Sequence, residues 1–566
     1  MLRTRWSATA ASLVLALVSS WTAVFARQPT NREDGSRGFH LPIQRTRRGR
    51  WKRDGDIFDT GLGDVLDTTY TVLVGVGGTL VPLIIDTGSA DLWTVSDGCH
   101  QCSTYDVALY PQRSLSPAGQ DVDLLYGDSR TGTHASGPIG TDTVGVAGLS
   151  IPDQCFAAIV DTNTSVLETG SSGILGLGFP PISVIWRQLL ALDLNGPVPT
   201  LTKRDVRPGP GRRTDAFPSF EFLNSTSSSR KRQDGSTPYT SAIDSFSTIG
   251  PLFTRLAALN ILSRPLVVTA LQRDTVSLGG NAGTLSLGAF PYDLTDDALT
   301  WVPVRGYRAS EGGLPPSPRA PNEVYPLVWE IPVDDVYFDG VKLPRSALSP
   351  RSISLSALVD TGNSLIRGPQ DIVGHIYALI GDSFDCSIPH NLSFQIGGVQ
   401  FPVDPRDFAQ PAAVRPGTVY PNEVARCSPA LAATDPPRAG GFLYSWSLGD
   451  PFLKSVLVAF YYGNMTHPSQ DPPRVGLLST VPSDAGTALE KAVASAVYHG
   501  GVFPSTSEPA PYATPIEMHT LDDIPPPMTQ GPQWAYSSGA ARAGASAWAT
   551  SLTMAVLVGV LGVLYH

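Results

Sequence analysis

Residues 83–89 read LIIDTGS, and residues 357–364 read ALVDTGNS. Each stretch is a short apolar run typical of a buried strand, and each ends in Asp-Thr-Gly, where a turn is expected. The residues before the first copy, 68–85, are rich in apolar and β-branched side chains without a helical period, which predicts strands and a hairpin. One Asp-Thr-Gly is ordinary turn chemistry, but two copies with the same apolar lead-in suggest an internal repeat.

A second pair of segments keeps step with the two Asp-Thr-Gly stretches. Gly176, in ILGLG, lies 90 positions after Asp86, and Gly449, in SLGD, lies 89 positions after Asp360. Unrelated turns would not keep this spacing. The sequence therefore predicts an all-β protein with two homologous β-rich lobes, each presenting one aspartate from a loop that follows a buried strand.

As a set, these segments resemble the pepsin-like (A1) aspartic proteases, and in style the fungal surface-anchored, yapsin-like enzymes. The resemblance covers about residues 66–478, with the two aspartate motifs, a flap and both apolar-apolar-Gly segments in the family's order. It implies the bilobal acid protease fold with a central cleft. It also implies peptide or protein substrates, with no cofactor and no metal.

The resemblance assigns catalysis to Asp86 and Asp360. Two adjacent carboxyl groups hold one proton over a range of acid pH and can together activate a water molecule, but which of them carries the proton belongs to the pair. Asn363 stands where a hydroxyl residue is common, although an amide can also donate to a carboxylate. The other supporting residues implied are Thr87 and Thr361 as a cross-brace, Gly88 and Gly362 for close backbone approach, Ser89 as a donor to Asp86, and Trp93 as the partner of the flap tyrosine.

Residues Tyr126, Gly127 and Asp128 fall where the family has the tip of a flap hairpin that covers the substrate. Tyr126 has a plainer interpretation as a cross-strand aromatic. Asp128 either pairs with a Lys or Arg side chain in the pocket before the scissile bond or is a solvated turn aspartate.

Five cysteines are too few for a disulfide-built scaffold. Cys386 and Cys427 resemble the second-lobe disulfide of the family, and Cys99 and Cys102 fit a small disulfide near the first aspartate loop. The alternative for this Cys-x-x-Cys segment is a redox or zinc site, but the sequence has no second cysteine pair or neighbouring histidine cluster to support a metal. Cys155 is left over, as a buried thiol or an intermolecular partner.

The chain has 566 residues, and its formal charge of −10 is unevenly distributed. Residues 1–53 hold 11 Lys/Arg against 2 Asp/Glu, and the rest is acidic, which argues against nucleic acid as a partner. Residues 1–26 match a secretory signal peptide. Residues 27–53 are predicted to form a removable basic propeptide, with dibasic sites for a processing protease just before Asp54, and the alternative is a solvated basic arm. Four sequences fit N-glycosylation, at Asn163, Asn224, Asn391 and Asn464.

The remaining organisation follows from changes in composition. An apolar tail preceded by small residues favours a glycolipid (GPI) anchor signal, with a transmembrane tail as the alternative. Both place a monomeric body on the extracellular face of the plasma membrane or in the cell wall. The expected segments are an N-terminal lobe at 54–295 with an exposed inserted loop at about 200–241, a C-terminal lobe at 296–481 with a second insertion at 306–322, a Pro/Ser-rich stalk at 482–538 and the anchor signal at 539–566.

Two functions remain open at this point. The first is a secreted, surface-anchored aspartic endopeptidase that hydrolyses peptide bonds at acidic pH. The second is a catalytically weak or inactive binding or adhesion module with the same fold, since fold does not determine function. Both aspartates and Tyr126 favour the enzyme, and Asn363 is the one local reason for hesitation.

Overall fold

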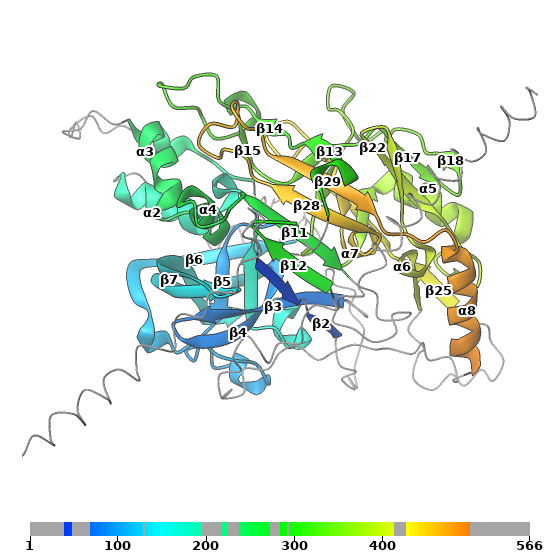
Figure 1. The fold of residues 1–566 in the computed structure, drawn as a ribbon, viewed down its shortest axis with the longest axis horizontal. Helices are drawn as coiled ribbons and strands as arrows, with labels where there is room; N and C mark the ends of the chain where they lie inside the picture. The colour runs from blue at the N-terminus through cyan, green and yellow to red at the C-terminus, as the bar shows by residue number, and fades with distance from the viewer. Residues whose placement is uncertain are drawn as a thin grey trace, which may run out of the picture. The chain divides into compact units, whose positions relative to one another are not determined.

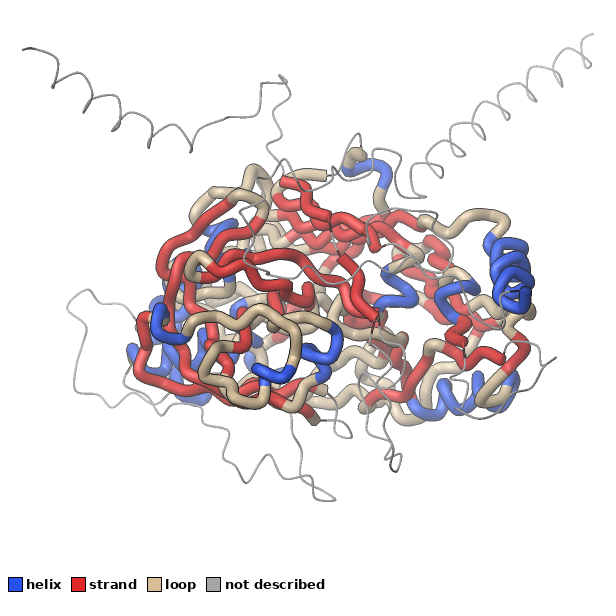
Figure 2. The backbone as a smooth tube through the Cα atoms, turned by 90° about the horizontal axis from the view of Figure 1, so that it is seen from below, coloured by secondary structure: helices blue, strands red, loops and turns tan. Residues whose placement is uncertain are grey.

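The computed structural model describes residues 39–42, 44–47, 68–127, 132–194, 217–224, 237–271, 283–290, 294–411 and 426–498. Strands dominate these residues, and the helices are short (Figures 1 and 2). The α-helices are α2 (Val184–Asp193), α3 (Pro238–Asp244), α4 (Leu252–Ala258), α5 (Gln370–Ile380), α6 (Pro405–Phe408), α7 (Asp450–Leu453) and α8 (Ala485–Tyr498). The 3-10 turns are η1 (Cys102–Thr104), η2 (Gln112–Ser114), η3 (Ser165–Thr169), η4 (Pro180–Ile182), η5 (Glu221–Leu223), η6 (Ser245–Ser247), η7 (Asp296–Ala298) and η8 (Ala309–Glu311).

The first half of the chain builds a mixed sheet around the first aspartate. In β3, Tyr70, Val72, Val74 and Val76 are all buried, as the two-residue period of a strand requires when one face meets the core. The next strand, β4, is buried along its last six residues and ends at Asp86. In sheet order the strands are β2 (Gln44–Arg47), β3 (Thr68–Val76), β4 (Thr79–Asp86), β10 (Gly173–Gly176), β5 (Leu92–Val95), β8 (Leu149–Ile159), β7 (Thr133–Val146) and β6 (Ser116–Tyr126), with β9 (Asp161–Thr162) on β7.

The second half repeats the design with shorter strands. Its central sheet runs β16 (Glu330–Pro332), β19 (Ser356–Val359), β27 (Trp446–Leu448), β20 (Ile366–Pro369) and β26 (Leu431–Thr434). This half also contains three smaller sheets. One consists of β18 (Val341–Lys342), β17 (Asp335–Phe338), β22 (Leu392–Ile396) and β23 (Val399–Pro402), and another of β21 (Phe384–Asp385), β25 (Arg426–Pro429) and β24 (Ala409–Pro411). The third pairs β14 (Gly306–Tyr307) with β15 (Tyr325–Pro326).

The strand pairings show that the two halves are copies of one arrangement. In the first, β10 runs parallel to β4 and antiparallel to β5. In the second, β27 runs parallel to β19 and antiparallel to β20. Each parallel pair places a segment that ends in an apolar residue followed by glycine beside the strand that leads to an aspartate. The prediction of two homologous β-rich lobes is confirmed.

A six-stranded antiparallel sheet joins the halves (Figure 1). It contains β1 (Phe39–Pro42), β12 (Gly283–Leu287), β11 (Leu266–Leu271), β28 (Val456–Tyr461), β29 (Arg474–Ser479) and β13 (Thr300–Pro303), in that order. Its edge strand β1 and the nearby β2, which pairs with β3, both come from the predicted propeptide. This part of residues 27–53 is therefore held to the body by strand pairing.

The inserted loop predicted at about 200–241 is not exposed throughout. Within it, Phe220, Phe222 and Leu223 are buried in the core. The ring of Phe217 packs at 5.2 Å from Phe442 and 6.1 Å from Tyr307, between ring centroids. The expectation of an exposed loop is wrong for residues 217–224, because four apolar side chains in this stretch have a core to enter.

The first part of the stalk predicted from residue 482 belongs to the folded body. Helix α8 covers Ala485–Tyr498, and it lies against α6. Its buried residues, Ala485, Leu489, Val493 and Ala496, recur every three or four positions and so share one face of the helix. The folded body therefore extends to Tyr498, and the sequence signal missed was this helical period.

Several predicted segments lie outside the described residues. These are the signal peptide at 1–26, the rest of the propeptide, the stalk beyond residue 498 and the anchor signal at 539–566. Among the residues that are described, no helix is both long enough and apolar enough to cross a membrane.

Candidate active site

The two Asp-Thr-Gly loops meet through a threonine bridge formed by Thr87 and Thr361. The backbone N–H of Thr87 donates to Thr361 Oγ1 at 3.0 Å, and the N–H of Thr361 donates to Thr87 Oγ1 at 2.9 Å. Each hydroxyl then donates to a carbonyl of the other lobe, Thr87 to Val359 O and Thr361 to Ile85 O, both at 2.8 Å. These four reciprocal bonds, between residues 272 to 276 positions apart in sequence, hold the loops face to face.

Each glycine of the motifs lies against the aspartate of the opposite loop. A Cβ atom at Gly88 would stand 2.5 Å from Asp360 Oδ1, and one at Gly362 would stand 2.4 Å from Asp86 Oδ1. No real Cβ contact is that short, so only glycine allows this approach. The two carboxyl groups are therefore close neighbours across the junction of the lobes.

Burial and mutual repulsion disfavour charge on this pair. Burial raises the pKa of Asp86, while hydrogen bonds from Ser89 and Gly88 oppose the shift. Burial also raises the pKa of Asp360, and the neighbouring charge of Asp86 raises it further. Two like charges this close cannot both ionise cheaply, so the pair keeps one proton over a range of pH.

The donors around the two carboxyl groups are unequal. Asp86 accepts from the backbone N–H of Gly88 at 2.8 Å and from the hydroxyl of Ser89. Asp360 accepts from the backbone N–H of Gly362 at 3.0 Å. Hydrogen bonds to a carboxylate stabilise its charged form, so the surroundings favour the negative charge on Asp86 and the shared proton on Asp360.

A layer of aromatic side chains supports the first aspartate loop from the other half of the chain. The N–H of Leu177, which follows the first apolar-apolar-Gly segment, donates to the carbonyl of Asp86 at 2.7 Å. The carbonyl of Leu177 accepts from Trp329 Nε1 at 2.9 Å and from the Tyr462 hydroxyl at 2.7 Å. Phe179, from the first half of the chain, packs against Trp329 with ring centroids 4.4 Å apart and the ring planes tilted by 45°. Sequence reasoning missed Trp329 and Tyr462, since neither stands in a motif.

The predicted flap is the β6–β7 hairpin. Tyr126 pairs with Thr133 in the last described register before the hairpin tip. The indole N–H of Trp93 donates to the Tyr126 hydroxyl at 2.6 Å. Burial, with the nearby Asp91 and Asp86, raises the pKa of Tyr126 well above its ordinary value, so the phenol stays protonated. Gly127 is exposed beside it, and Asp128 lies outside the described residues.

Comparison with known proteins supplies the family. A profile of the eukaryotic aspartyl proteases matches residues 69–192 and 239–467. The chain belongs to the eukaryotic aspartyl protease family. This confirms the resemblance drawn from the two aspartate motifs.

Relatives in the aspartyl protease family are distant in sequence but match over most of their length. Cathepsin E-A of Xenopus laevis is 26% identical over 434 residues, which cover 74% of this chain and 81% of that protein. Pepsin A of Sus scrofa is 24% identical over 427 residues, covering 72% of this chain and 82% of its own. Major aspartyl peptidase 1 of Cryptococcus neoformans var. grubii is 22% identical over 440 residues, covering 74% and 72%.

The aspartyl protease body carries two disulfides. Cys99 bonds to Cys102 beside the first loop, with Cα atoms 5.3 Å apart. Cys386 bonds to Cys427 across 41 positions, with Cα atoms 5.0 Å apart. Cys155 is a free, buried thiol, and burial raises its pKa to about 11, so it remains protonated. Among the described residues, no group of three or more His, Cys, Asp or Glu side chains is arranged to hold a metal ion.

The candidate glycosylation sites differ in access. Asn163, Asn224 and Asn391 are exposed, whereas Asn464 is half-buried. The side-chain oxygens of Asn163, Asn224 and Asn464 all accept hydrogen bonds, so it is burial that sets Asn464 apart. The three exposed asparagines are therefore the more accessible acceptors.

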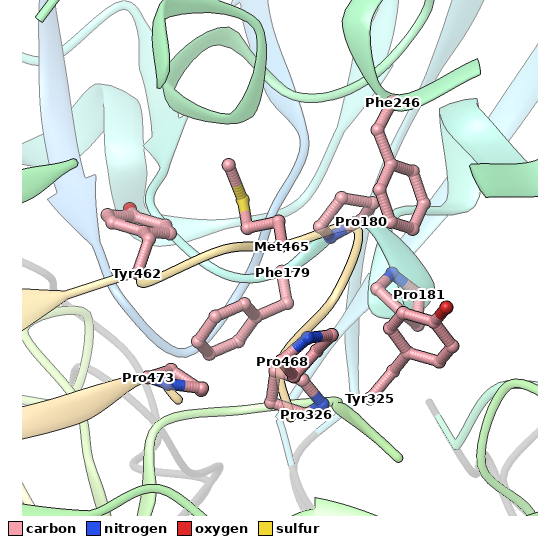
Figure 3. A pocket seen from close by; sticks show the side chains of 10 residues that line it. All are labelled: Phe179, Pro180, Pro181, Phe246, Tyr325, Pro326, Tyr462, Met465, Pro468 and Pro473. Carbon is pink, nitrogen blue, oxygen red and sulfur yellow. The ribbon is translucent and has the colours of Figure 1, made fainter. Parts of the chain in front are cut away.

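An apolar pocket near the aromatic layer is too small for a substrate side chain (Figure 3). Its volume of about 10 Å³ is close to that needed for one water molecule. The lining residues are Phe179, Pro180, Pro181, Phe246, Tyr325, Pro326, Tyr462, Met465, Pro468 and Pro473, and neither aspartate is among them.

Proposed function

We propose that this aspartyl protease is an acid endopeptidase in which Asp86 and Asp360 act together on one water molecule. The observation that carries the proposal is the reciprocal geometry of the two loops, in which each motif glycine touches the opposite carboxyl group. The threonine bridge supports it, because it keeps the carboxyl groups together without using their oxygens.

In the proposed chemistry, the ionised carboxylate and the protonated carboxyl group have different roles. The ionised carboxylate, which the donors favour at Asp86, takes a proton from the water as its oxygen attacks the peptide carbonyl. The protonated carboxyl group, favoured at Asp360, hydrogen-bonds to the carbonyl oxygen as negative charge develops there. The departing amine receives a proton from the pair. The flap hairpin with Tyr126 covers the substrate and excludes bulk water.

Cleavage of a peptide library by the processed body tests this proposal. We expect cleavage between about pH 3 and 6, the range in which such a pair holds one proton. Asp86→Asn, Asp360→Asn and added pepstatin should each abolish it, whereas the exposed Asp382→Asn serves as the matched control and should leave it intact. Cleavage that survives Asp86→Asn or pepstatin would refute the assignment, and no cleavage at any pH would favour a binding module.

The same library tests the role of Asp128. A carboxylate at this position would favour substrates with Lys or Arg before the scissile bond. Asp128→Ser should then reduce cleavage after Lys and Arg more than cleavage after Leu or Phe. An equal loss for both substrate classes would remove the charge-pairing role.

We further propose that the enzyme is made as a zymogen in the secretory pathway and is anchored at the cell surface. The leader pattern at 1–26, the two disulfides and the exposed asparagines are typical of that route. The pairing of β1 and β2 with the body supports a propeptide that stays associated until a processing protease acts near Asp54. Release of the protein from membranes by a phospholipase specific for glycolipid anchors would support the anchor, and retention would favour a transmembrane tail.

A further inference from the structure

The two aspartate loops differ at the residue that directly follows each Asp-Thr-Gly motif. In the first loop, Ser89 places its hydroxyl on Asp86. In the second, Asn363 stands at the matching position and is buried, with 5% of its surface exposed. Its amide nitrogen donates to Ser447 Oγ at 2.8 Å, away from Asp360. The side chain that would supply the second donor to Asp360 is therefore turned to another partner.

The side-chain oxygen of Asn363 is also hydrogen-bonded. It accepts from the backbone N–H of Leu365 at 3.2 Å and from Arg367 Nε at 3.3 Å. With both ends of the amide engaged, rotation toward Asp360 would break three hydrogen bonds. Burial makes that loss costly, because the orphaned groups would have no water to replace the partner.

Arg367 brings a positive charge to the same loop. It lies on β20, paired in register with Ser447, the residue that holds the Asn363 amide. Its charge acts on Asp360 and partly opposes the rise in that pKa, whose largest cause is burial. Among the described residues, Asp86 of β4 also acts on Asp360, and its charge raises that pKa. Asp450 of α7 adjoins the same loop, since its backbone N–H donates to the carbonyl of Asn363 at 2.8 Å.

We propose that Asn363 and Arg367 are positioning residues that set the upper pH limit of the enzyme. Asn363 withholds a hydrogen-bond donor from Asp360, and Arg367 replaces part of the missing stabilisation with charge. As a result, the enzyme remains active at less acidic pH than the same enzyme with a hydroxyl residue at position 363. The proposal rests on the acid endopeptidase function proposed above.

The direction follows from the proton that the pair must keep. Activity is lost on the alkaline side when the singly protonated pair loses its last proton. A hydroxyl donor to Asp360 would stabilise the doubly ionised pair, so this loss would occur at lower pH. Removing the charge of Arg367 would destabilise the doubly ionised pair, so the loss would occur at higher pH. The two substitutions should therefore move one limb of the pH profile in opposite directions.

The test is the pH dependence of kcat/KM with an uncharged peptide substrate, which reports the pKa values of the free enzyme. A lower fraction of folded protein reduces kcat/KM at every pH by the same factor, so it does not move the midpoint of a limb. Asn363→Thr and Asn363→Ser should move the alkaline limb down by about one pH unit, the size expected for one charge-assisted hydrogen bond. Arg367→Gln should move it up, and Arg367→Lys, which keeps the charge, should restore it to the wild-type position. The exposed Arg351→Gln is the charge-matched control and should leave the limb in place.

The outcomes separate this proposal from the function on which it rests. If the wild-type enzyme cleaves no peptide at any pH, the endopeptidase function fails. If it cleaves but the alkaline limb stays in place in Asn363→Thr, Asn363→Ser and Arg367→Gln, the role of these residues is overturned while the function stands. A limb that moves equally in Arg367→Gln and Arg351→Gln would show only a general effect of net charge, and would also overturn it.

Discussion

The threonine bridge provides the sharpest test of how the two lobes are joined. Thr361 is buried, with 3% of its surface exposed, and its hydroxyl accepts from the Thr87 N–H and donates to the Ile85 carbonyl. Thr361→Val keeps the shape of the side chain but removes both bonds. The variant leaves one buried N–H and one buried C=O without partners in the other lobe.

The cost can be worked from these two groups. A buried donor or acceptor left unsatisfied costs about 1–3 kcal/mol, so Thr361→Val should lower the free energy of unfolding by about 2–6 kcal/mol. Thr361→Ser is the matched control, since it keeps the hydroxyl and loses one methyl group, worth about 0.8 kcal/mol. Looser loops should also lower kcat, because a shift of about 1 Å at catalytic groups can cost about 100-fold.

Urea unfolding followed by tryptophan fluorescence measures the stability difference. The variants are compared in an Asp86→Asn background, where self-digestion is not expected, and kcat is measured in the native background. A Thr361→Val protein whose free energy of unfolding lies within about 1 kcal/mol of Thr361→Ser would refute the reasoning. That result would mean that the inter-lobe hydrogen bonds contribute little and that packing alone joins the loops.

Three further predictions concern the rest of the body. Replacing both cysteines of the Cys386–Cys427 disulfide by serine should lower the free energy of unfolding by about 4 kcal/mol, as a closed loop of this length implies, and an unchanged urea midpoint would contradict it. Leu489→Ala on the buried face of α8 should lower the free energy of unfolding by about 2–5 kcal/mol, whereas the exposed Val497→Ala should lower it by less than about 0.5 kcal/mol. Equal urea midpoints for the two variants would show that α8 does not stabilise the body. The free energy of unfolding should rise as pH falls from about 7.5 to about 5, because carboxyl groups with raised pKa bind protons more tightly in the folded than in the unfolded state. The groups are Asp86, Asp91, Glu330 and Asp360, in each of which burial is the largest cause. Asp360→Asn should flatten this dependence in urea titrations at several pH values, and a stability that increases with pH would contradict the prediction.

The repeat and the two candidate catalytic aspartates can be read from the sequence alone. Two Asp-Thr-Gly stretches, each with an apolar-apolar-Gly segment 89 or 90 positions later, are enough to predict two β-rich lobes and a pair of aspartates. These features are readable because they are local. A buried strand, a turn that needs glycine and an ionisable side chain each leave their mark within a few residues.

The contacts that the side chains of these motifs make are visible only in the folded structure. The sequence shows that Asn363 replaces a hydroxyl residue, but its amide donates to Ser447, 84 residues away, rather than to Asp360. Trp329 and Tyr462 support the first loop through the carbonyl of Leu177, from which they lie 152 and 285 residues away in sequence. The buried face of α8 is readable from its helical period, but residues 217–224 belong to the body because their apolar side chains find a core only after the lobes have folded. Such contacts depend on which surfaces become neighbours, and no local pattern records that.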